Sequence, residues 1–303
     1  MKNKKKALVS GATGYIGSNL VKGLILEGYS VGILCRRTSS LGLLHSVKEK
    51  ISIHIIDNQY KSIEKAVSSF KPDIVFHLAS LFLSQHQSSD IKELMDSNIL
   101  FGSFLIDALA ENGVNKIINT GTSWEHYNDQ DYNPVNLYSA TKKAYESILQ
   151  YYIESFNVNV INLKLYDTYG PNDPRKKIIN ILIDQIGKRE PLLMSPGEQL
   201  LDLTYIEDIV SGYIHAADLL FKKTFPGSEY VVRSGRLYSL RDLIELINKL
   251  SGLKSNVKLG GRPYRFREVM VPWQKGEVLP GWKARYNLSE GLKKILSAPL
   301  RKI

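Results

Sequence analysis

The chain contains very little cysteine and no long apolar run. Its 303 residues include one cysteine, Cys35, so no intrachain disulfide can form, and this usage fits a reducing compartment. No apolar stretch approaches the ~20 residues that a membrane-spanning helix requires. The basic N-terminus leads directly into Ala7–Val9 and a glycine-rich turn, which predicts a buried strand rather than a signal peptide. We therefore expect a cytoplasmic protein without membrane association.

Acidic side chains are too few to balance the basic ones. The chain has 40 Lys and Arg residues against 30 Asp and Glu, a formal net charge of +10. The cations are scattered apart from Lys2–Lys6 and Arg175–Lys177, and no helix-turn-helix, zinc-finger or RNP-type pattern accompanies them. We therefore expect no nucleic-acid partner and no metal site. The charge indicates either a solvated basic surface or ligands that carry phosphate.

Short apolar runs alternate with helix-length amphipathic stretches over the first two-thirds of the chain. Each run is rich in Val, Ile or Leu and is closed by polar or glycine residues, as in a parallel sheet that helices cover on both faces. The expected strands are Ala7–Ser10, Val31–Cys35, Ile51–Ile56, Ile74–Leu78, Lys116–Thr120 and Val158–Leu165, and the expected helices include Tyr15–Glu27, Ile91–Glu111 and Tyr138–Phe156.

The turn that follows the N-terminal strand reads VSGATGYIGSNL. It places Gly11, Gly14 and Gly17 at a spacing that allows a tight turn, close backbone approach to a pyrophosphate, and close packing of helix on sheet. The N-terminus of the next helix offers free N–H groups to phosphates. A glycine-rich turn without a ligand is the alternative. Its position favours a dinucleotide cofactor, contacted also by Tyr15 and Ile16, in an α/β fold with a Rossmann-type doubly wound parallel sheet.

The end of the second strand bears on the choice of nicotinamide cofactor. An NAD site usually has Asp or Glu there, but this chain has Cys35 followed by Arg36 and Arg37. Guanidinium groups suit a 2′-phosphate. We therefore favour NADP(H), with NAD(H) as the alternative. Asp57, after the third strand, is expected either to accept from the adenine amino group or to form a turn.

The pattern becomes less regular beyond Tyr169-Gly170-Pro171. We expect residues 1–170 to form a dinucleotide-binding domain and residues 171–303 to form a smaller α/β lobe that binds substrate. Segments near Asp202 can return to the large domain. The helical stretches of the lobe are Ile178–Gly187, Ile206–Phe221, Ser239–Leu250 and Leu288–Leu296.

Tyr138 and Lys142 carry the strongest chemical signal, because they lie four residues apart on one face of an expected helix. A phenol with a pKa of ~10 exchanges protons poorly at neutral pH, and a neighbouring cation lowers that pKa. Lys142 can also hydrogen-bond the nicotinamide ribose. Upstream, Ser123 is our choice for the hydroxyl that holds a substrate oxygen, with Thr122 as its rival. Either hydroxyl can instead form a cap or a turn.

Together these motifs resemble the extended short-chain dehydrogenase/reductases, the NAD-dependent epimerase/dehydratase family that acts on nucleotide sugars. The resemblance implies that Tyr138 is the acid/base, Lys142 its modulator and Ser123 the oxygen-holding hydroxyl, with a supporting role for Asn98. It covers roughly the first 170 residues, through GATGYIG, Asp57, HLAS (in which Leu78 and Ala79 contact the cofactor), Asn98, Thr122-Ser123, YSATK and LYDTYGP.

Departures from the family pattern narrow the expected chemistry. Dehydratases of the family have an Asp–Glu pair after the catalytic Thr, but Trp124 and Glu125 stand here, and an indole cannot protonate a leaving hydroxyl. Asp167 replaces an Asn that often contacts substrate, and Leu201 replaces an Arg. In TGTSWEHY, LYDTYGPNDPR and GGRPYRFREVM the chain is similar to reductases of CDP-linked 4-keto-deoxyhexoses, the CDP-abequose and CDP-paratose synthases. That similarity implies NADPH.

Three functions stay open at this point. The favoured one is an NADPH-dependent reductase of a nucleotide-linked 4-keto deoxy sugar, and the second is an NAD-dependent nucleotide-sugar epimerase. The third is a non-catalytic sensor or structural protein, which has no need of an intact Tyr–Lys–Ser set. The resemblance implies a homodimer that pairs through Ile91–Glu111 and Tyr138–Phe156, and ordinary core faces are the alternative explanation of the apolar stripes on these helices. Substrate contacts are expected from Ser80, Glu125, Asp167, Arg175 and Arg265, with Arg265 for the diphosphate unless these cations are surface charge.

Overall fold

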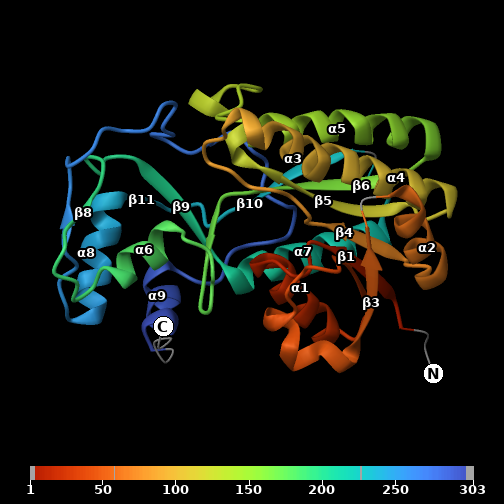
Figure 1. Ribbon diagram of the computed structural model, residues 1–303, viewed down its shortest axis with the longest axis horizontal. Helices are drawn as coiled ribbons and strands as arrows, with labels where there is room; N and C mark the ends of the chain where they lie inside the picture. Colours follow the sequence, from red (N-terminus) through yellow and green to blue (C-terminus); the bar gives the residue numbers. More distant parts are fainter. Residues whose placement is uncertain (1–3, 58, 226, 298–303) are drawn as a thin grey trace.

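The centre of the fold is a sheet of seven parallel strands. The computed structural model describes residues 4–57, 59–225 and 227–297, and there the strand order is β10-β6-β5-β4-β1-β2-β3 (Figure 1). The order reverses between β1 and β4, and ligands of doubly wound sheets bind at the carboxyl ends of the strands beside such a reversal. The strands are β1 (Lys6–Ser10), β2 (Ser30–Arg36), β3 (Ile51–Ile56), β4 (Ile74–His77), β5 (Lys116–Thr122), β6 (Asn159–Leu165) and β10 (Ser228–Val232).

Helices cover both faces of this sheet. Along β1, Ala7 and Val9 pack into the core under α1 and α7, whereas Leu8 packs into the core under α2, α4 and α5 (Figure 1). Both faces of the strand are therefore apolar, which explains the continuous apolar runs in the sequence. No helix in the described part of the chain is both long and apolar enough to cross a membrane. The helices of the large domain are α1 (Tyr15–Leu26), α2 (Tyr60–Phe70), α3 (Ile91–Met95), α4 (Phe101–Glu111), α5 (Leu137–Phe156) and α7 (Ile206–Lys222).

A smaller lobe lies beside the carboxyl ends of the strands (left in Figure 1). It has a three-stranded sheet of order β11-β9-β7 and a short β12-β8 pair, packed with α6, α8 and α9 around a separate apolar core. Its elements are β7 (Asp167–Tyr169), α6 (Ile178–Asp184), β8 (Leu192–Leu193), β9 (Leu200–Tyr205), β11 (Leu237–Ser239), α8 (Leu240–Ser251), β12 (Val257–Lys258) and α9 (Leu288–Leu296).

The predicted α/β class and doubly wound parallel sheet are confirmed. All six predicted strands lie in the sheet, with ends that differ by at most two residues. The predicted helix Ile91–Glu111 is α3 and α4 joined by a π-helical turn, Asp96–Leu100. The seventh strand, β10, comes from beyond residue 170. The segment around Asp202 does not join the large sheet, because β9 pairs with β7 and β11.

Candidate active site

The turn between β1 and α1 accepts only glycine at two positions. Gly11 has φ +70°, and a Cβ there would lie 2.6 Å from the backbone nitrogen of Ala79. A Cβ on Gly17 would collide with the Gly11 carbonyl oxygen. The first N–H groups of α1 have no side-chain cap, so they remain available to an anion. The turn therefore fits a dinucleotide pyrophosphate. Tyr15 has a different role, because its hydroxyl donates to the Pro171 carbonyl (3.1 Å) and joins α1 to the smaller lobe.

A cleft of about 390 Å³ opens beside this turn. Arg36 lines it at the end of β2, whereas Arg37 and Asp57 do not. The Asp57 carboxylate instead accepts the Gln59 backbone N–H (3.0 Å), as a turn-forming Asp does. Of the three residues predicted to contact the adenosine part of the cofactor, only Arg36 lines the cleft. The predicted cofactor residues that line it are Gly11, Gly14, Arg36, Leu78 and Ala79.

Tyr138 and Lys142 line a cavity of about 180 Å³ that shares Leu78 and Ser80 with the cofactor cleft. Lys142 is 1% exposed, and its ammonium group makes no hydrogen bond with any residue that the structure describes. A buried ammonium group with three unused donors fits the hydroxyl groups of a ribose. Lys142 therefore fits a nicotinamide cofactor lying in the cleft.

The pKa of the Tyr138 phenol is raised in the structure, whereas the sequence predicted that it is lowered. Burial raises the pKa of the Tyr138 phenol, the charge of Glu125 raises it further, and the hydroxyls of Ser80 and Thr122 act in the opposite direction. We predicted that Lys142 lowers this pKa, but burial dominates and the ammonium group is not among the main influences. Burial also lowers the pKa of Lys142, against the effect of nearby carboxylates.

The two candidate hydroxyls, Thr122 and Ser123, occupy different places at the end of β5. Thr122 is the last residue of the strand; its Oγ1 accepts the Trp124 backbone N–H (3.3 Å), and its hydroxyl interacts with the Tyr138 phenol. Ser123 begins the 3₁₀ turn Ser123–Glu125 and is not among the groups that act on Tyr138. Both hydroxyls line the catalytic cavity, and of the two only that of Thr122, the residue we ranked second, acts on the pKa of Tyr138.

Aromatic rings form one wall of the catalytic cavity. The Phe82 ring packs edge-on against Tyr138, with centroids 5.0 Å apart, and lies 5.6 Å from the Trp124 ring. This wall offers no hydrogen-bonding group from Phe82 and only the indole N–H from Trp124. It suits an apolar face of a ligand. The other predicted residues that line the cavity are Ile16, Ser80, Thr122, Ser123, Asp167 and Arg175.

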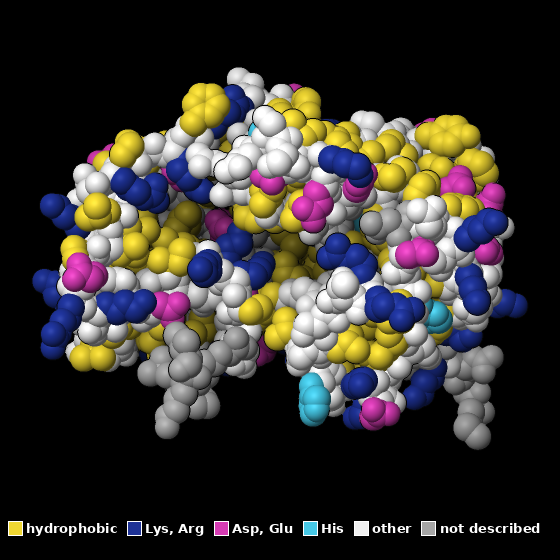
Figure 2. Space-filling view, in the orientation of Figure 1, with side chains coloured by type: hydrophobic (Ala, Val, Ile, Leu, Met, Phe, Trp, Pro, Cys, Tyr) yellow, Lys and Arg dark blue, Asp and Glu magenta, His cyan; other side chains and the backbone are white. Residues whose placement is uncertain are grey.

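The cations near this cavity differ in whether a carboxylate already pairs with them. Arg175 donates to Asp173 (2.7 Å), and Arg265, in a smaller adjoining cavity, is paired with Glu268 (3.0 Å). Lys177, which the sequence analysis noted only within a basic stretch, lines the catalytic cavity and has no ion pair among the described residues. Its Nζ lies 4.0 Å from the Phe82 ring centroid. Lys and Arg side chains also gather around the hollow between the lobes in Figure 2.

Asn98 supports the site from behind, within the π-helical turn Asp96–Leu100. Its Oδ1 accepts the Leu81 N–H (2.7 Å), and its Nδ2 donates to the Thr141 hydroxyl (2.9 Å). The Asn98 amide therefore connects the segment after β4 to α5, and both its oxygen and its nitrogen are hydrogen-bonded. π-Helical turns of this kind are frequent at functional sites.

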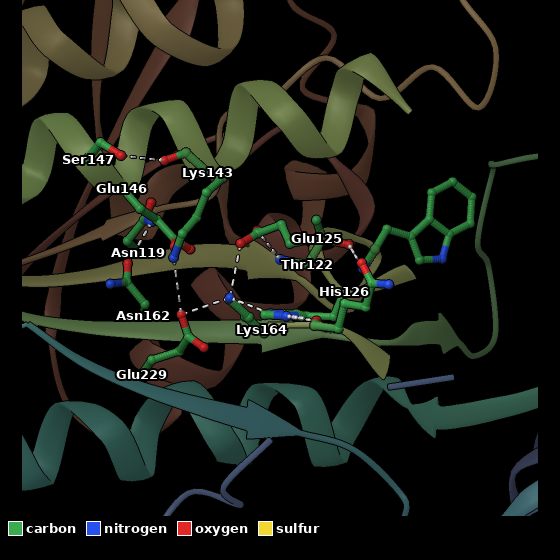
Figure 3. Close-up of polar contacts among 12 residues, drawn as sticks. Asn119, Thr122, Glu125, His126, Lys143, Glu146, Ser147, Asn162, Lys164 and Glu229 are labelled. Atoms are coloured by element: carbon green, nitrogen blue, oxygen red, sulfur yellow. Dashed lines mark hydrogen bonds and ion pairs between the residues drawn. The ribbon is translucent and has the colours of Figure 1, made fainter. Parts of the chain in front are cut away.

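Glu125 does not lie in the cavity, which corrects the prediction that it contacts substrate. Its side chain is fully buried, and neither cavity includes it in its lining. Its Oε1 accepts the Thr122 backbone N–H (3.2 Å), and its Oε2 lies 3.0 Å from the Lys164 ammonium nitrogen (Figure 3). Attraction to Lys164 turns the carboxylate inward, away from the ligand space.

Comparisons with known proteins identify the family of the chain. The profile of the NAD dependent epimerase/dehydratase family matches residues 7–230. CDP-abequose synthase of Yersinia pseudotuberculosis is 28% identical over 98% of this chain and 100% of its own length. UDP-glucose 4-epimerase of Mycolicibacterium smegmatis is 25% identical over 95% of this chain and 96% of its own.

A solved structure agrees with the fold. UDP-glucuronic acid 4-epimerase from Bacillus cereus, in complex with UDP-glucuronic acid and NAD, superposes with a TM-score of 0.85 at 24% identity. The alignment covers 96% of this chain and 98% of that one. The family profile spans more than half of the chain and includes the glycine turn, Tyr138 and Lys142. The chain therefore belongs to the NAD dependent epimerase/dehydratase family of nicotinamide-cofactor enzymes.

Proposed function

We propose that the chain is a reductase that uses NADPH to reduce the 4-keto group of a nucleotide-linked deoxy sugar, of the CDP-4-keto-3,6-dideoxyhexose type. The observation that carries this proposal is the end of β2. Cys35 stands where an NAD site has a carboxylate, and Arg36 lines the cofactor cleft. A site suited to the 2′-phosphate favours NADPH, a reductant consumed in each turnover, over a permanently bound NAD. The CDP-abequose synthase relative supports a CDP-linked substrate.

The residues around the cavity have clear roles in such a reduction. The bound cofactor supplies the hydride that reaches the carbonyl carbon. Tyr138 gives its phenolic proton to the carbonyl oxygen, and Thr122 donates a hydrogen bond to the same oxygen as charge develops on it. Lys142 holds the ribose through its unused ammonium donors. Tyr138 then regains a proton from solvent.

We assign the substrate diphosphate to Lys177 rather than to Arg265. Arg265 is already neutralised by Glu268, whereas Lys177 brings an unpaired positive charge to the wall of the catalytic cavity. Asp167 and Asp173 lie near enough to act on the Lys177 charge, but neither forms an ion pair with it among the described residues, so its ammonium group remains available to an anion. The apolar wall of Phe82 and Trp124 would then face the deoxygenated part of the sugar, where no hydroxyl group has to be desolvated.

A second candidate is an NAD-dependent nucleotide-sugar 4-epimerase. The UDP-glucose 4-epimerase relative favours it, because the same Tyr138, Lys142 and hydroxyl serve a transient oxidation as well as a reduction. We give no weight to a non-catalytic role, since a sensor has no use for this constellation. A cytoplasmic location is also proposed, from the single, buried cysteine.

The deciding experiment follows consumption of reduced cofactor by its absorbance, with CDP-, dTDP- and GDP-linked 4-keto-6-deoxy and 3,6-dideoxy sugars. We expect turnover with NADPH, better than with NADH, and loss of activity in Tyr138→Phe. Arg36→Ala should weaken NADPH use by about 10- to 100-fold through loss of charge-assisted hydrogen bonds, and Arg37→Ala far less. An inactive panel, together with NAD released on denaturation, would replace the reductase by the epimerase.

A further inference from the structure

A small cavity of about 50 Å³ adjoins the catalytic cavity and is not used by the reaction described above. The two cavities share four lining residues, Ser123, Trp124, Tyr166 and Asp167, so the small one is a side pocket of the catalytic cavity. A water molecule needs roughly 10–15 Å³ of such space. The side pocket can therefore hold one substituent of a sugar ring but not the ring itself.

Trp273 lines the side pocket but not the catalytic cavity, and its ring is held in place. The indole stacks on the His126 ring, with centroids 3.6 Å apart and planes 11° apart, and the Lys164 ammonium nitrogen lies 5.4 Å from its centroid. His126 is fixed in turn, because Lys164 Nζ lies 2.7 Å from its Nε2 (Figure 3). The backbone carbonyl of Trp273 accepts the Tyr166 hydroxyl (2.6 Å). The indole ring therefore cannot rotate without losing these contacts.

The indole N–H of Trp273 has no acceptor. The residue is 8% exposed, and its Nε1 is a buried atom that makes no hydrogen bond with any described residue. An indole nitrogen is a donor only, and a buried donor without a partner lowers stability. By contrast, Nε1 of Trp282, another buried indole, donates to Ser211 Oγ (2.9 Å). An unpaired N–H on the wall of a pocket therefore indicates an acceptor atom that a ligand supplies.

Asp167 brings an acceptor to the same pocket. Its carboxylate makes no hydrogen bond and no ion pair with any residue that the structure describes, and Asp167 lines both the pocket and the catalytic cavity. The other two carboxylates of the pocket are occupied, Asp202 by backbone N–H groups and Glu268 by Arg265. An unpaired N–H together with an unpaired carboxylate matches a hydroxyl group, which accepts one hydrogen bond and donates another.

We propose that the side pocket binds the C2 hydroxyl of the sugar ring, with Trp273 Nε1 as the donor and Asp167 as the acceptor. The inference rests on the proposed function, because a 4-keto-3,6-dideoxyhexose retains only this ring hydroxyl. The arrangement follows the order of the ring carbons. C4 lies at Tyr138, the deoxygenated C3 faces Trp124, which lines both cavities, and C2 reaches the side pocket. Trp273 is thus a specificity-determining residue that distinguishes a sugar with a C2 hydroxyl from one without it.

The test measures the binding of two matched ligands to the full-length protein by calorimetry, without cofactor, so that no turnover takes place. The ligands are a CDP-linked 3,6-dideoxyhexose and its 2-deoxy analogue. The wild type should bind the first at least about 10-fold more tightly, because the analogue leaves a buried donor and a carboxylate unpaired. Trp273→Phe keeps a stacked ring but removes the N–H. It should bind the first ligand about 3- to 10-fold more weakly and the analogue as the wild type does.

Trp282→Phe is the matched control, because the Trp282 N–H already has a protein acceptor and its ring packs in the core under α1 and α7. It should preserve the wild-type difference between the two ligands. The comparison of ligands in the wild type needs no variant. Equal binding of both would mean that the Trp273 N–H meets only water, and would overturn the inference. So would a Trp273→Phe variant that weakens both ligands alike, which is the effect of a purely structural role.

The same comparison with UDP-glucose and its 2-deoxy analogue separates this inference from the proposed function. Binding that depends on the C2 hydroxyl for the UDP pair alone would support the side pocket and contradict only the CDP-linked reductase. Such binding for the CDP pair supports both. A protein that binds neither pair would overturn both.

Discussion

Two adjacent hydroxyl-bearing residues, Thr122 and Ser123, separate because β5 ends between them. Thr122 keeps the strand direction and reaches Tyr138, whereas Ser123 turns into the 3₁₀ segment. Replacing Thr122 by Val should lower kcat by about 10²- to 10³-fold, as expected for loss of one donor to a developing oxyanion. Ser123→Ala should leave kcat close to that of the wild type. Steady-state kinetics of both variants decide between them, and a larger loss in Ser123→Ala would reverse the assignment.

His77 gives the protein a dependence of stability on pH. It is fully buried at the end of β4, with Nδ1 2.8 Å from Ser10 Oγ, and burial together with the charge of Lys142 lowers its pKa to about 3. In the unfolded chain the histidine binds a proton below its ordinary pKa of ~6.5. The free energy of unfolding should therefore be greatest above ~6.5 and should decrease as the pH falls from there toward 3.

Urea denaturation at a series of pH values checks this expectation for His77. The decrease should be weaker in His77→Gln, whose amide can still hydrogen-bond Ser10 but does not titrate. Replacement of the exposed His45 by Gln serves as the control and should leave the pH dependence as in the wild type. An unchanged slope in His77→Gln would assign the acid sensitivity to other groups.

The position of a site residue could be predicted from the sequence only where its partners are close to it along the chain. Tyr138 and Lys142 share one helix, so their spacing alone places them together. Glu125 could not be placed in this way. Its partner Lys164 stands opposite Gly121 only through the register of β5 with β6, a pairing that no local pattern encodes. The sequence therefore indicates a carboxylate after Thr122 and Ser123 but not that it turns inward.

The β1–α1 turn is the element in which a single methyl group should have the largest effect. A Cβ on Gly17 would meet the Gly11 carbonyl oxygen and the Ala12 Cα (2.8 Å), both of which belong to the backbone and cannot swing aside. We expect Gly17→Ala to lower the free energy of unfolding by about 1–3 kcal/mol, as overpacking does, and to weaken dinucleotide binding.

Fluorescence titration with NADPH and chemical denaturation measure both effects of Gly17→Ala. Gly42→Ala is the matched control, because its added Cβ would meet nothing closer than Ser40 Oγ at 3.5 Å. Normal NADPH binding by Gly17→Ala would mean that the turn relaxes and is not held by the packing of α1 against β1.

Helices and strands were predicted well where the residues of the segment itself carry a clear hydrophobic pattern. Ile51–Ile56 is a strand over the whole predicted range, because alternating apolar residues and flanking polar ones define it locally. β10 was missed for the opposite reason. Its five residues, SEYVV, have no distinctive pattern, and they are a strand because β6 offers them a parallel edge.

At the scale of the whole molecule, we propose a homodimer formed through α4 and α5. Tyr151 and Phe156 are exposed at the end of α5 with ring centroids 5.9 Å apart, and Tyr152 beside them donates to Asp107 of α4 (2.8 Å). Exposed aromatic rings grouped at the end of one helix are typical of a contact surface. Light scattering of the purified protein should give the mass of two chains.

The variant Tyr151→Glu should shift this mass toward a single chain, because a charge would have to be buried in the contact. Leu26→Glu on α1 is the control, since Leu26 is 86% exposed on the other face of the sheet. A wild-type mass of one chain would remove the homodimer from the proposal and would not affect the active site.

The return of β10 to the central sheet has a consequence for any attempt to divide the protein. The chain leaves the sheet after β6, builds much of the smaller lobe, and then supplies α7 to cover α1 and β10 to pair with β6. A fragment cut after residue 170 would therefore expose the backbone edge of β6 and the apolar side of α1. Such an unprotected edge invites pairing between chains. The nucleotide-binding half is thus a product of the complete polypeptide, and a truncated gene would yield aggregate rather than a smaller working module.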